Sequence, residues 1–187
     1  MRFPPLRVEQ LLAEQKRYAD ALLVPPRAAA FTEPPYRAYI RNPALAETIR
    51  PLSEYLRWKT SLPPRLSEMA ILITARQWSA QYEWAVHYPL AIKGGLAESI
   101  AADIAAGRRP TGMKDDEAAL YDLAIELYRD KKVSDPAYQA AQAHFGELGI
   151  MDVIALIGYY AFVSMTLITM EAEIPENGVT PLAPLTV

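Results

Sequence analysis

One stretch near the end of the chain constrains the fold more than any other. Residues 153–170 form a run of eighteen residues without a charged side chain. A run of that length is either a short membrane span or a helix buried in a bundle or an oligomer. The flanking residues Glu147, Asp152, Glu171 and Glu173 are acidic, and no Lys or Arg lies nearby to anchor a span. We therefore expect a buried central helix rather than a membrane segment.

The rest of the chain also predicts helices. It contains no alternating strand pattern of any length, no glycine-rich phosphate loop and no clear short repeat. Apolar periodicity and capping residues predict helices over residues 8–23, 43–58, 64–78, 81–93, 98–106, 135–148 and 151–171, and one more helix that starts at residue 115. The fold class predicted from these patterns is all-α.

Prolines and caps mark the boundaries in the first third of the chain. Asn42 followed by Pro43 is a helix cap with proline at the first helical position. Pro51 is expected to kink or split the helix that follows. Residues 24–35 carry four prolines in two pairs and form a loop. That loop is a candidate lid over a site, or an arm onto a neighbouring subunit.

Composition excludes several classes of function. The chain has 187 residues and no cysteine, which excludes disulfides, thiolate metal sites and thiol peroxidase chemistry on its own side chains. Its net charge is −3, and no basic stripe argues for a nucleic-acid partner. The first residues lack the apolar core of a signal peptide. One domain in the cytoplasm is the expectation.

A carboxylate and an imidazole lie one helical turn apart in the middle of the chain. If residues 81–88 are helical, Glu83 and His87 share one face and are within reach of each other. Such a pair can handle protons, or it can be a purely structural helix pair. Glu68 lies early in the preceding helix, where a carboxylate either supports the helix dipole, in a pair with Arg65, or takes part in chemistry.

The spacing of these residues resembles a known superfamily. Glu68-x11-Ala80-x2-Glu83-x3-His87 is similar to the motif of the alkylhydroperoxidase D and carboxymuconolactone decarboxylase superfamily. The peroxidase branch has cysteines at the positions of Ala80 and Glu83, so the chain resembles the decarboxylase branch. The resemblance continues through residues 58–68, 95–96 and 158–160, and it covers roughly residues 40 to 175.

The resemblance implies an alkylhydroperoxidase D-like multi-helix bundle that assembles into a homo-oligomer, commonly a trimer or hexamer. Residues 1–187 would form one helical domain, divided into an N-terminal helix and proline-rich arm (1–40), a core (41–175) and a tail (176–187). The chain adds about 40 residues at the front and a proline-rich tail relative to dedicated decarboxylases.

The resemblance also implies an activity, that of a cofactor-free carboxy-lyase acting on a carboxylated lactone. No cofactor is required, because the lactone carbonyl itself accepts the electrons that the departing carbon dioxide leaves behind. His87 falls on the active-site histidine of the family and would donate the proton, polarised by Glu83 or Glu68. A lactone isomerase or hydrolase remains an alternative, as does a helical oligomer that binds a small molecule without turnover.

Three further residues are candidates for substrate binding. Arg76 lies two turns past Glu68 and could hold a substrate carboxylate as a fork donor, with a structural ion pair as its alternative fate. Tyr82 and Trp84 are candidates for the pocket wall or for packing. No metal site is expected, because Glu-x-x-x-His occurs once and lacks a third ligand.

Overall fold

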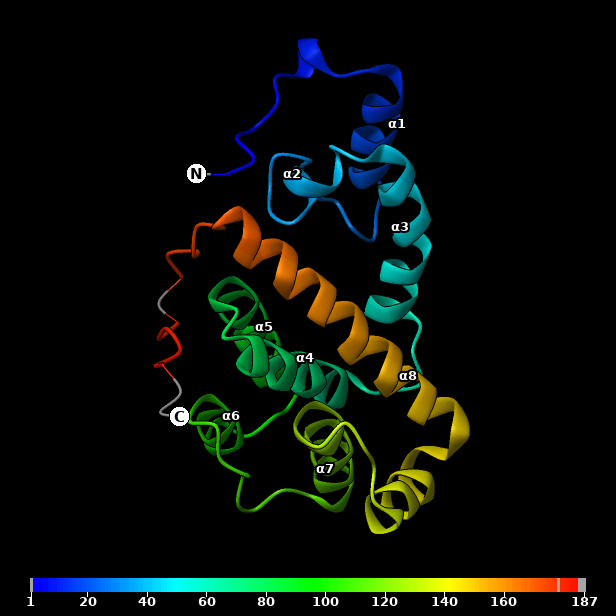
Figure 1. Cartoon of the computed structure of the whole chain (residues 1–187), viewed down its shortest axis with the longest axis vertical. Helices are drawn as coiled ribbons and strands as arrows, with labels where there is room; N and C mark the ends of the chain where they lie inside the picture. Colours follow the sequence, from blue (N-terminus) through cyan, green and yellow to red (C-terminus); the bar gives the residue numbers. More distant parts are fainter. Residues whose placement is uncertain (1, 178, 185–187) are drawn as a thin grey trace. The chain divides into compact units, whose positions relative to one another are not determined.

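The computed structural model describes residues 2–177 and 179–184, and all regular structure among them is helical (Figure 1). The elements are η1 (Val8–Gln10), α1 (Ala13–Leu22), α2 (Tyr36–Tyr39), α3 (Pro43–Trp58), α4 (Pro64–Trp78), α5 (Gln81–Lys93), α6 (Glu98–Ala105), α7 (Asp115–Arg129) and α8 (Asp135–Met170). The all-α prediction is confirmed.

The chain divides into two compact units. The first comprises the chain up to Lys59 together with Met165–Ala172, and the second comprises Thr60–Ser164 and the segment from Glu173 onward. Helix α8 contributes residues to both. That the whole chain is one domain stays a prediction.

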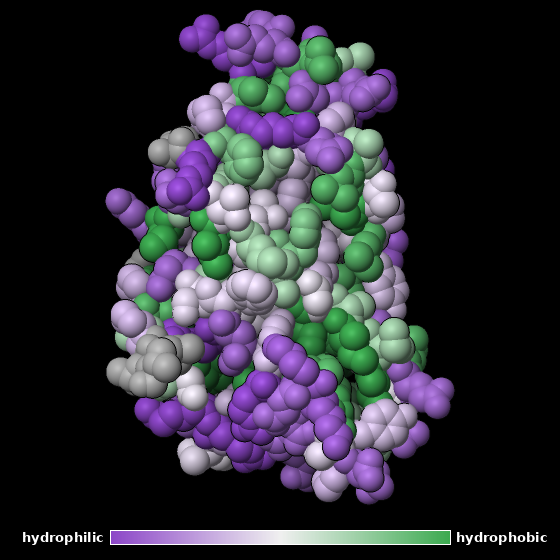
Figure 2. Space-filling view, viewed as in Figure 1, coloured by the Kyte–Doolittle hydropathy of each residue, from purple (hydrophilic) through white to green (hydrophobic). Residues whose placement is uncertain are grey.

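Helix α8 contains the uncharged stretch and is long and apolar enough to cross a membrane, by length and composition alone. Only 44% of its most apolar stretch of 18 residues is buried by the rest of the chain. The remainder of this stretch is exposed to solvent or is covered by another molecule. Large hydrophobic residues are exposed along it: Leu148, Met151, Ile154, Met165 and Ile168. Figure 2 shows hydrophobic side chains on the visible face around the end of α8 that lies at the lower right in Figure 1.

The break inside α8 differs from the sequence prediction. We expected a helix to end near Leu148 and to be closed by Gly149. The non-helical residue is instead Gly146, with φ 61° and ψ −176°. Only glycine adopts this conformation readily. Gly149 is needed for a different reason, since a Cβ on it would lie 2.6 Å from the Cβ of Phe145.

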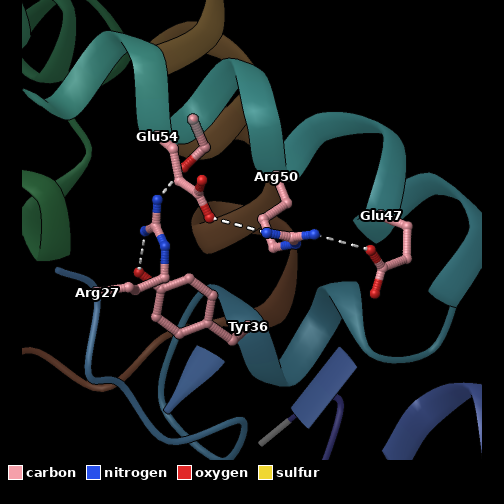
Figure 3. Close-up of polar contacts among 6 residues, drawn as sticks. Arg27, Tyr36, Glu47, Arg50 and Glu54 are labelled. Atoms are coloured by element: carbon pink, nitrogen blue, oxygen red, sulfur yellow. Dashed lines mark hydrogen bonds and ion pairs between the residues drawn. The ribbon is translucent and has the colours of Figure 1, made fainter. Parts of the chain in front are cut away.

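In the first unit, the proline-rich loop is attached to α3 through Arg27. Its Nη1 donates to the Tyr36 hydroxyl at 2.7 Å and its Nη2 to the Ser53 hydroxyl at 2.5 Å. The guanidinium also lies over the rings of Tyr36 and Trp58, 5.5 Å and 4.9 Å from their centroids. Figure 3 shows Arg27 beside Tyr36, and farther along α3 the ion pairs that link Arg50 to Glu47 and Glu54. The loop prediction is confirmed, and Arg27 holds the loop within this unit.

Two helix predictions in this unit need correction. The predicted helix over residues 8–23 is interrupted, because Leu11 and Leu12 have extended backbone and separate η1 from α1. The Leu12 amide donates to the side chain of Gln15, which caps α1 at this point. Pro51 does not split α3, which runs unbroken from Pro43 to Trp58. Pro51 is exposed, so the Glu47 carbonyl that it deprives of a partner can be hydrated.

The cap of α3 is confirmed, while its inward face differs from expectation. Asn42 Oδ1 accepts a hydrogen bond from the Leu45 amide at 3.1 Å. Leu56 is buried as expected, but Leu45 and Leu52, which we expected to point inward, are 41% and 44% exposed.

The second unit is built around α4. All of its residues from Met69 to Ala75 are buried, as the unbroken apolar run predicted. Helices α5, α6 and α7 pack against α4. The Tyr128 hydroxyl of α7 donates to the Ile157 carbonyl of α8 at 3.0 Å and contacts the Thr74 hydroxyl at 3.1 Å. A helix surrounded in this way can present polar side chains only at its ends and toward its neighbours, and this is where the candidate site lies.

Candidate functional site

Two carboxylates flank one buried imidazole where α4 and α5 meet. His87 Nδ1 lies 2.6 Å from Glu68 Oε2, and His87 Nε2 lies 3.2 Å from Glu83 Oε2. The three residues are 6%, 3% and 5% exposed in the order Glu68, Glu83, His87. The sequence-predicted catalytic residues therefore lie together, in a place from which bulk water is largely excluded.

The local structure explains how residues nineteen positions apart meet. Glu83 and His87 are one turn apart on α5, so their contact follows from helix geometry. Glu68 comes from α4, and the chain returns toward it through a tight turn at Ser79 and Ala80. Ser79 has the left-handed conformation, with φ 50° and ψ 38°, and its amide bonds back to the Arg76 carbonyl. This turn lets α5 pack along α4 with His87 facing Glu68.

A third helix completes the surroundings of His87. Tyr160 of α8 meets the imidazole edge to face, with ring centroids 5.1 Å apart and an interplanar angle of 86°. Tyr160 is buried. From the sequence we expected Tyr160 only in a core or an interface. No local sequence pattern indicates how α8 packs against α5, so the contact between His87 and Tyr160 could not be predicted from the sequence.

The electrostatics of the cluster favour a charged histidine. Burial alone lowers the pKa of His87, but the charge of Glu83 and the hydrogen bond to Glu68 outweigh it, so the pKa is raised above its usual 6.5. Protonation of His87 is therefore more favourable than protonation of a free imidazole.

The two carboxylates hold His87 differently. The contact with Glu68 is a short hydrogen bond that fixes Nδ1. Glu83 Oε2 lies within ion-pair distance of Nε2, but it has no hydrogen-bond partner of good alignment. Glu68 thus orients the ring, while the Nε2 side retains a poorly aligned proton that a better acceptor could take.

Arg65 has partners other than the one considered from the sequence. It forms ion pairs with Asp116 and Glu117 at the start of α7. The carboxylates of α7 are thus partners of Arg65, and a pairing of Arg65 with Glu68 stays a prediction.

The predicted substrate-binding residues lie in a different environment. Arg76 is 1% exposed, and its Nη1 donates to the Ala183 carbonyl at 2.8 Å. Among the described residues it forms no ion pair, so the structural ion pair considered for it is not found. Trp84 is buried and lies 5.9 Å from the Tyr88 ring, while Tyr82 is half-buried.

Trp84 and Tyr88 belong to a groove of about 650 Å³ beside α5. Its walls come from α5, from α6 and from the C-terminal part of the chain: Trp84, Tyr88, Pro89, Ala102, Ala105, Ala106, Asn177, Val179, Thr180, Pro181, Leu182 and Ala183. None of Glu68, Glu83 and His87 lines it. The structure therefore brings the acid–base residues together and places Trp84 on an adjacent face of the same helix.

Within residues 2–177 and 179–184, no group of three or more histidine, aspartate or glutamate side chains is arranged to hold a metal ion. The imidazole and the two carboxylates of the cluster are groups that can transfer protons.

Comparison with known proteins finds a family match for the middle of the chain. Residues 43–126 match the model of the carboxymuconolactone decarboxylase family, a segment that contains Glu68, Glu83 and His87. A curated relative, the bifunctional glutamine synthetase adenylyltransferase/adenylyl-removing enzyme of Bordetella bronchiseptica, is 30% identical over 157 residues. The match covers 77% of this chain, but the chain spans only 16% of that relative's length.

Solved structures share the fold at low sequence identity. A peroxidase-related protein from Silicibacter has a TM-score of 0.72 at 12% identity, covering 89% of this chain and 87% of that one. The debrominase Bmp8, a cysteine-to-alanine variant in complex with 2,3,4-tribromopyrrole, has a TM-score of 0.66 at 14% identity, covering 94% and 92%. A protein of unknown function from Agrobacterium tumefaciens, described provisionally as the antioxidant defence protein AhpD, has a TM-score of 0.65 at 16% identity, covering 74% and 95%.

The family match over residues 43–126 and these shared folds support the resemblance carried by the Glu68-to-His87 motif: this segment is similar to the carboxymuconolactone decarboxylase family, and the chain has the fold of the alkylhydroperoxidase D-like structures.

Proposed function

We propose that this protein is a cofactor-free carboxy-lyase that acts on a carboxylated lactone, with His87 as the proton donor. The observation that carries the proposal is the buried imidazole between two carboxylates, with its pKa raised above 6.5. An imidazolium that neighbouring carboxylates stabilise and the fold shelters from water is suited to deliver a proton to carbon.

The proposed step needs one proton and no electron carrier. The bond between the substrate ring and its carboxylate breaks, and carbon dioxide leaves. The electron pair moves through the ring double bond into the lactone carbonyl and forms an enolate. The enolate then collapses as a ring carbon takes the proton from His87 Nε2, and solvent returns a proton to the imidazole. The sum is the loss of carbon dioxide and the gain of one proton.

Each residue of the cluster has a proposed role in this step. Glu68 holds Nδ1 and so keeps Nε2 directed toward the substrate. Glu83 stabilises the imidazolium by its charge, and because its Oε2 makes no well-aligned hydrogen bond, the Nε2 proton can pass to the substrate. The chain carries no cysteine, so a peroxidase reaction on its own thiols is excluded. The tribromopyrrole complex of the debrominase supports a ring-sized ligand for a protein of this fold.

The test is carbon dioxide release from a panel of carboxylated lactones. We expect release by the wild type, and a loss of about a hundredfold or more in His87→Gln, the range that general acid catalysis contributes. His144→Gln is the matched control, because His144 is exposed on α8 and should leave turnover unchanged. Since the acid form is the active one, kcat should fall as pH rises through the raised pKa of His87.

Other outcomes select among the alternatives. Binding of a lactone without release of carbon dioxide would overturn the proposal and favour a binding protein. Conversion of the lactone without release would favour an isomerase or a hydrolase. A small molecule is the proposed partner, rather than nucleic acid or a membrane, and the cytoplasm is the proposed compartment.

A further inference from the structure

A buried cation without a matching anion lies next to the C-terminal part of the chain. The guanidinium of Arg76 is almost fully buried. Only Nη1 has an acceptor, the Ala183 carbonyl, while Nε and Nη2 are buried without a hydrogen-bond partner among the described residues. Leaving donors of a charged group unpaired in the interior costs free energy. A fold tolerates such a cost where the group serves a ligand.

The unpaired donors match one kind of ligand group. A guanidinium presents its N–H bonds as a planar fork, which two oxygens of a carboxylate can accept in parallel. A single peptide carbonyl, such as that of Ala183, satisfies only part of the fork. The chemistry of Arg76 therefore selects a carboxylate over a neutral acceptor.

The groove that Ala183 lines is suited to the rest of such a ligand. Its volume of about 650 Å³ lies within the range of small-molecule sites. The lining contains the rings of Trp84 and Tyr88 together with alanines of α6, and it contains no charged side chain. A flat apolar ring would contact these walls, and its carboxylate would be drawn toward Ala183, whose carbonyl accepts the hydrogen bond from Arg76.

The wall on the Arg76 side is an extended peptide held by few contacts. In this tail segment (residues 179–184), the Leu182 amide donates to Gln81 Oε1 at 2.8 Å, and Gln81 Nε2 donates to the Leu182 carbonyl at 2.9 Å. The segment has no helical hydrogen bonds of its own. The Ala183 carbonyl can therefore move off Arg76 without unfolding a helix.

We propose that this groove is a binding site for a small ring compound that carries a carboxylate, with Arg76 holding the carboxylate in place of the Ala183 carbonyl. The site goes beyond the proposed function. It does not include Glu68, Glu83 or His87, and it requires no proton transfer.

Benzoate is the probe, and benzamide, which has nearly the same shape but no charge, is its reference. Calorimetry on the full chain near neutral pH should detect benzoate binding at least tenfold tighter than benzamide binding. Arg76→Gln should weaken benzoate about tenfold or more and leave benzamide unchanged. Arg129→Gln is the matched control, because Arg129 is exposed and already paired with Asp130. Its affinity for benzoate should equal that of the wild type.

Two further variants keep the assignment testable if Arg76→Gln fails to fold. Ala105→Trp fills the groove from the partly exposed α6 wall and should abolish binding of both compounds. His87→Gln should bind benzoate as the wild type does, even if it has lost carbon dioxide release. The proposal is overturned if the wild type binds no benzoate, if Arg76→Gln binds it equally well, or if His87→Gln loses it while Ala105→Trp does not.

Discussion

At the scale of single residues, His87 depends on both helices that flank it. Its contact with Glu83 could be predicted, because residues four apart on a helix face each other. The resemblance pointed to Glu68 as well, but the short hydrogen bond to Nδ1 depends on the turn at Ser79 and on how α5 packs on α4. Tyr160 could not be predicted at all, since its contact joins helices far apart in the sequence.

Arg76 shows a different limit of sequence reasoning. Because a guanidinium can donate two parallel hydrogen bonds, we expected Arg76 to bind a substrate carboxylate. The competing expectation was an ion pair with a carboxylate of the chain itself. Neither an i±4 carboxylate nor a long-range one pairs with it among the described residues. The acceptor that it does meet is a backbone carbonyl 107 positions away, which no spacing in the sequence could reveal.

Protonation of His87 should stabilise the folded protein in a pH-dependent way. Because folding raises its pKa above 6.5, the folded state binds the proton more tightly than the unfolded state does. The stabilisation is fully present below about pH 6.5 and is lost as pH rises through the folded pKa. It amounts to about 1.4 kcal/mol for each pH unit that separates the folded and unfolded pKa values.

Urea unfolding between pH 6 and pH 9 measures this effect, with the wild type compared against His87→Gln. The free energy of unfolding of the wild type should fall over this range more steeply than that of the variant. His144→Gln should follow the wild type, because its side chain is exposed. Parallel curves for the wild type and His87→Gln would contradict a raised pKa.

At the scale of elements, the caps were more predictable than the breaks. Asn42 was expected to cap α3, and its side chain accepts a hydrogen bond from the amide three residues on, as Ser134 does at the start of α8. A helix cap involves residues only a few positions apart, so the residue types at those positions are enough to predict it. The break in α8 was placed at Gly149 instead of Gly146, because two nearby glycines give the same signal and only packing distinguishes them.

The two roles of glycine in α8 lead to opposite expectations for alanine. Gly146→Ala forces a Cβ onto a residue with φ 61°, which should cost about 1–3 kcal/mol of folding free energy. Gly158→Ala adds a Cβ to a helical residue with nothing within 4 Å, and should be neutral or stabilise by about 0.5–1 kcal/mol. Chemical denaturation of both variants checks the pair. Equal effects would mean that the chain does not break at Gly146.

At the scale of the whole molecule, α8 leaves large hydrophobic side chains uncovered. Within the second unit, the exposed residues Met151 and Ile154 lie three positions apart and so form an apolar stripe on one side of the helix. An exposed apolar stripe of this kind is usually covered by a partner. We propose that the cover is a second copy of this chain, in a trimer or a hexamer, and not a lipid bilayer.

The two covers predict different behaviour. An oligomer should purify without detergent, and light scattering after size exclusion should give three or six times the chain mass of 20.8 kDa. Ile154→Glu places a charge in the stripe and should dissociate the oligomer, because burying an unpaired carboxylate in an apolar interface costs several kcal/mol. Ser99→Glu adds the same charge on the exposed side of α6 and should leave the mass unchanged.

A wild-type monomer in detergent-free buffer would rule out the oligomer. Co-flotation of the wild type with lipid vesicles, lost in Ile154→Glu, would show that α8 is covered by lipid instead.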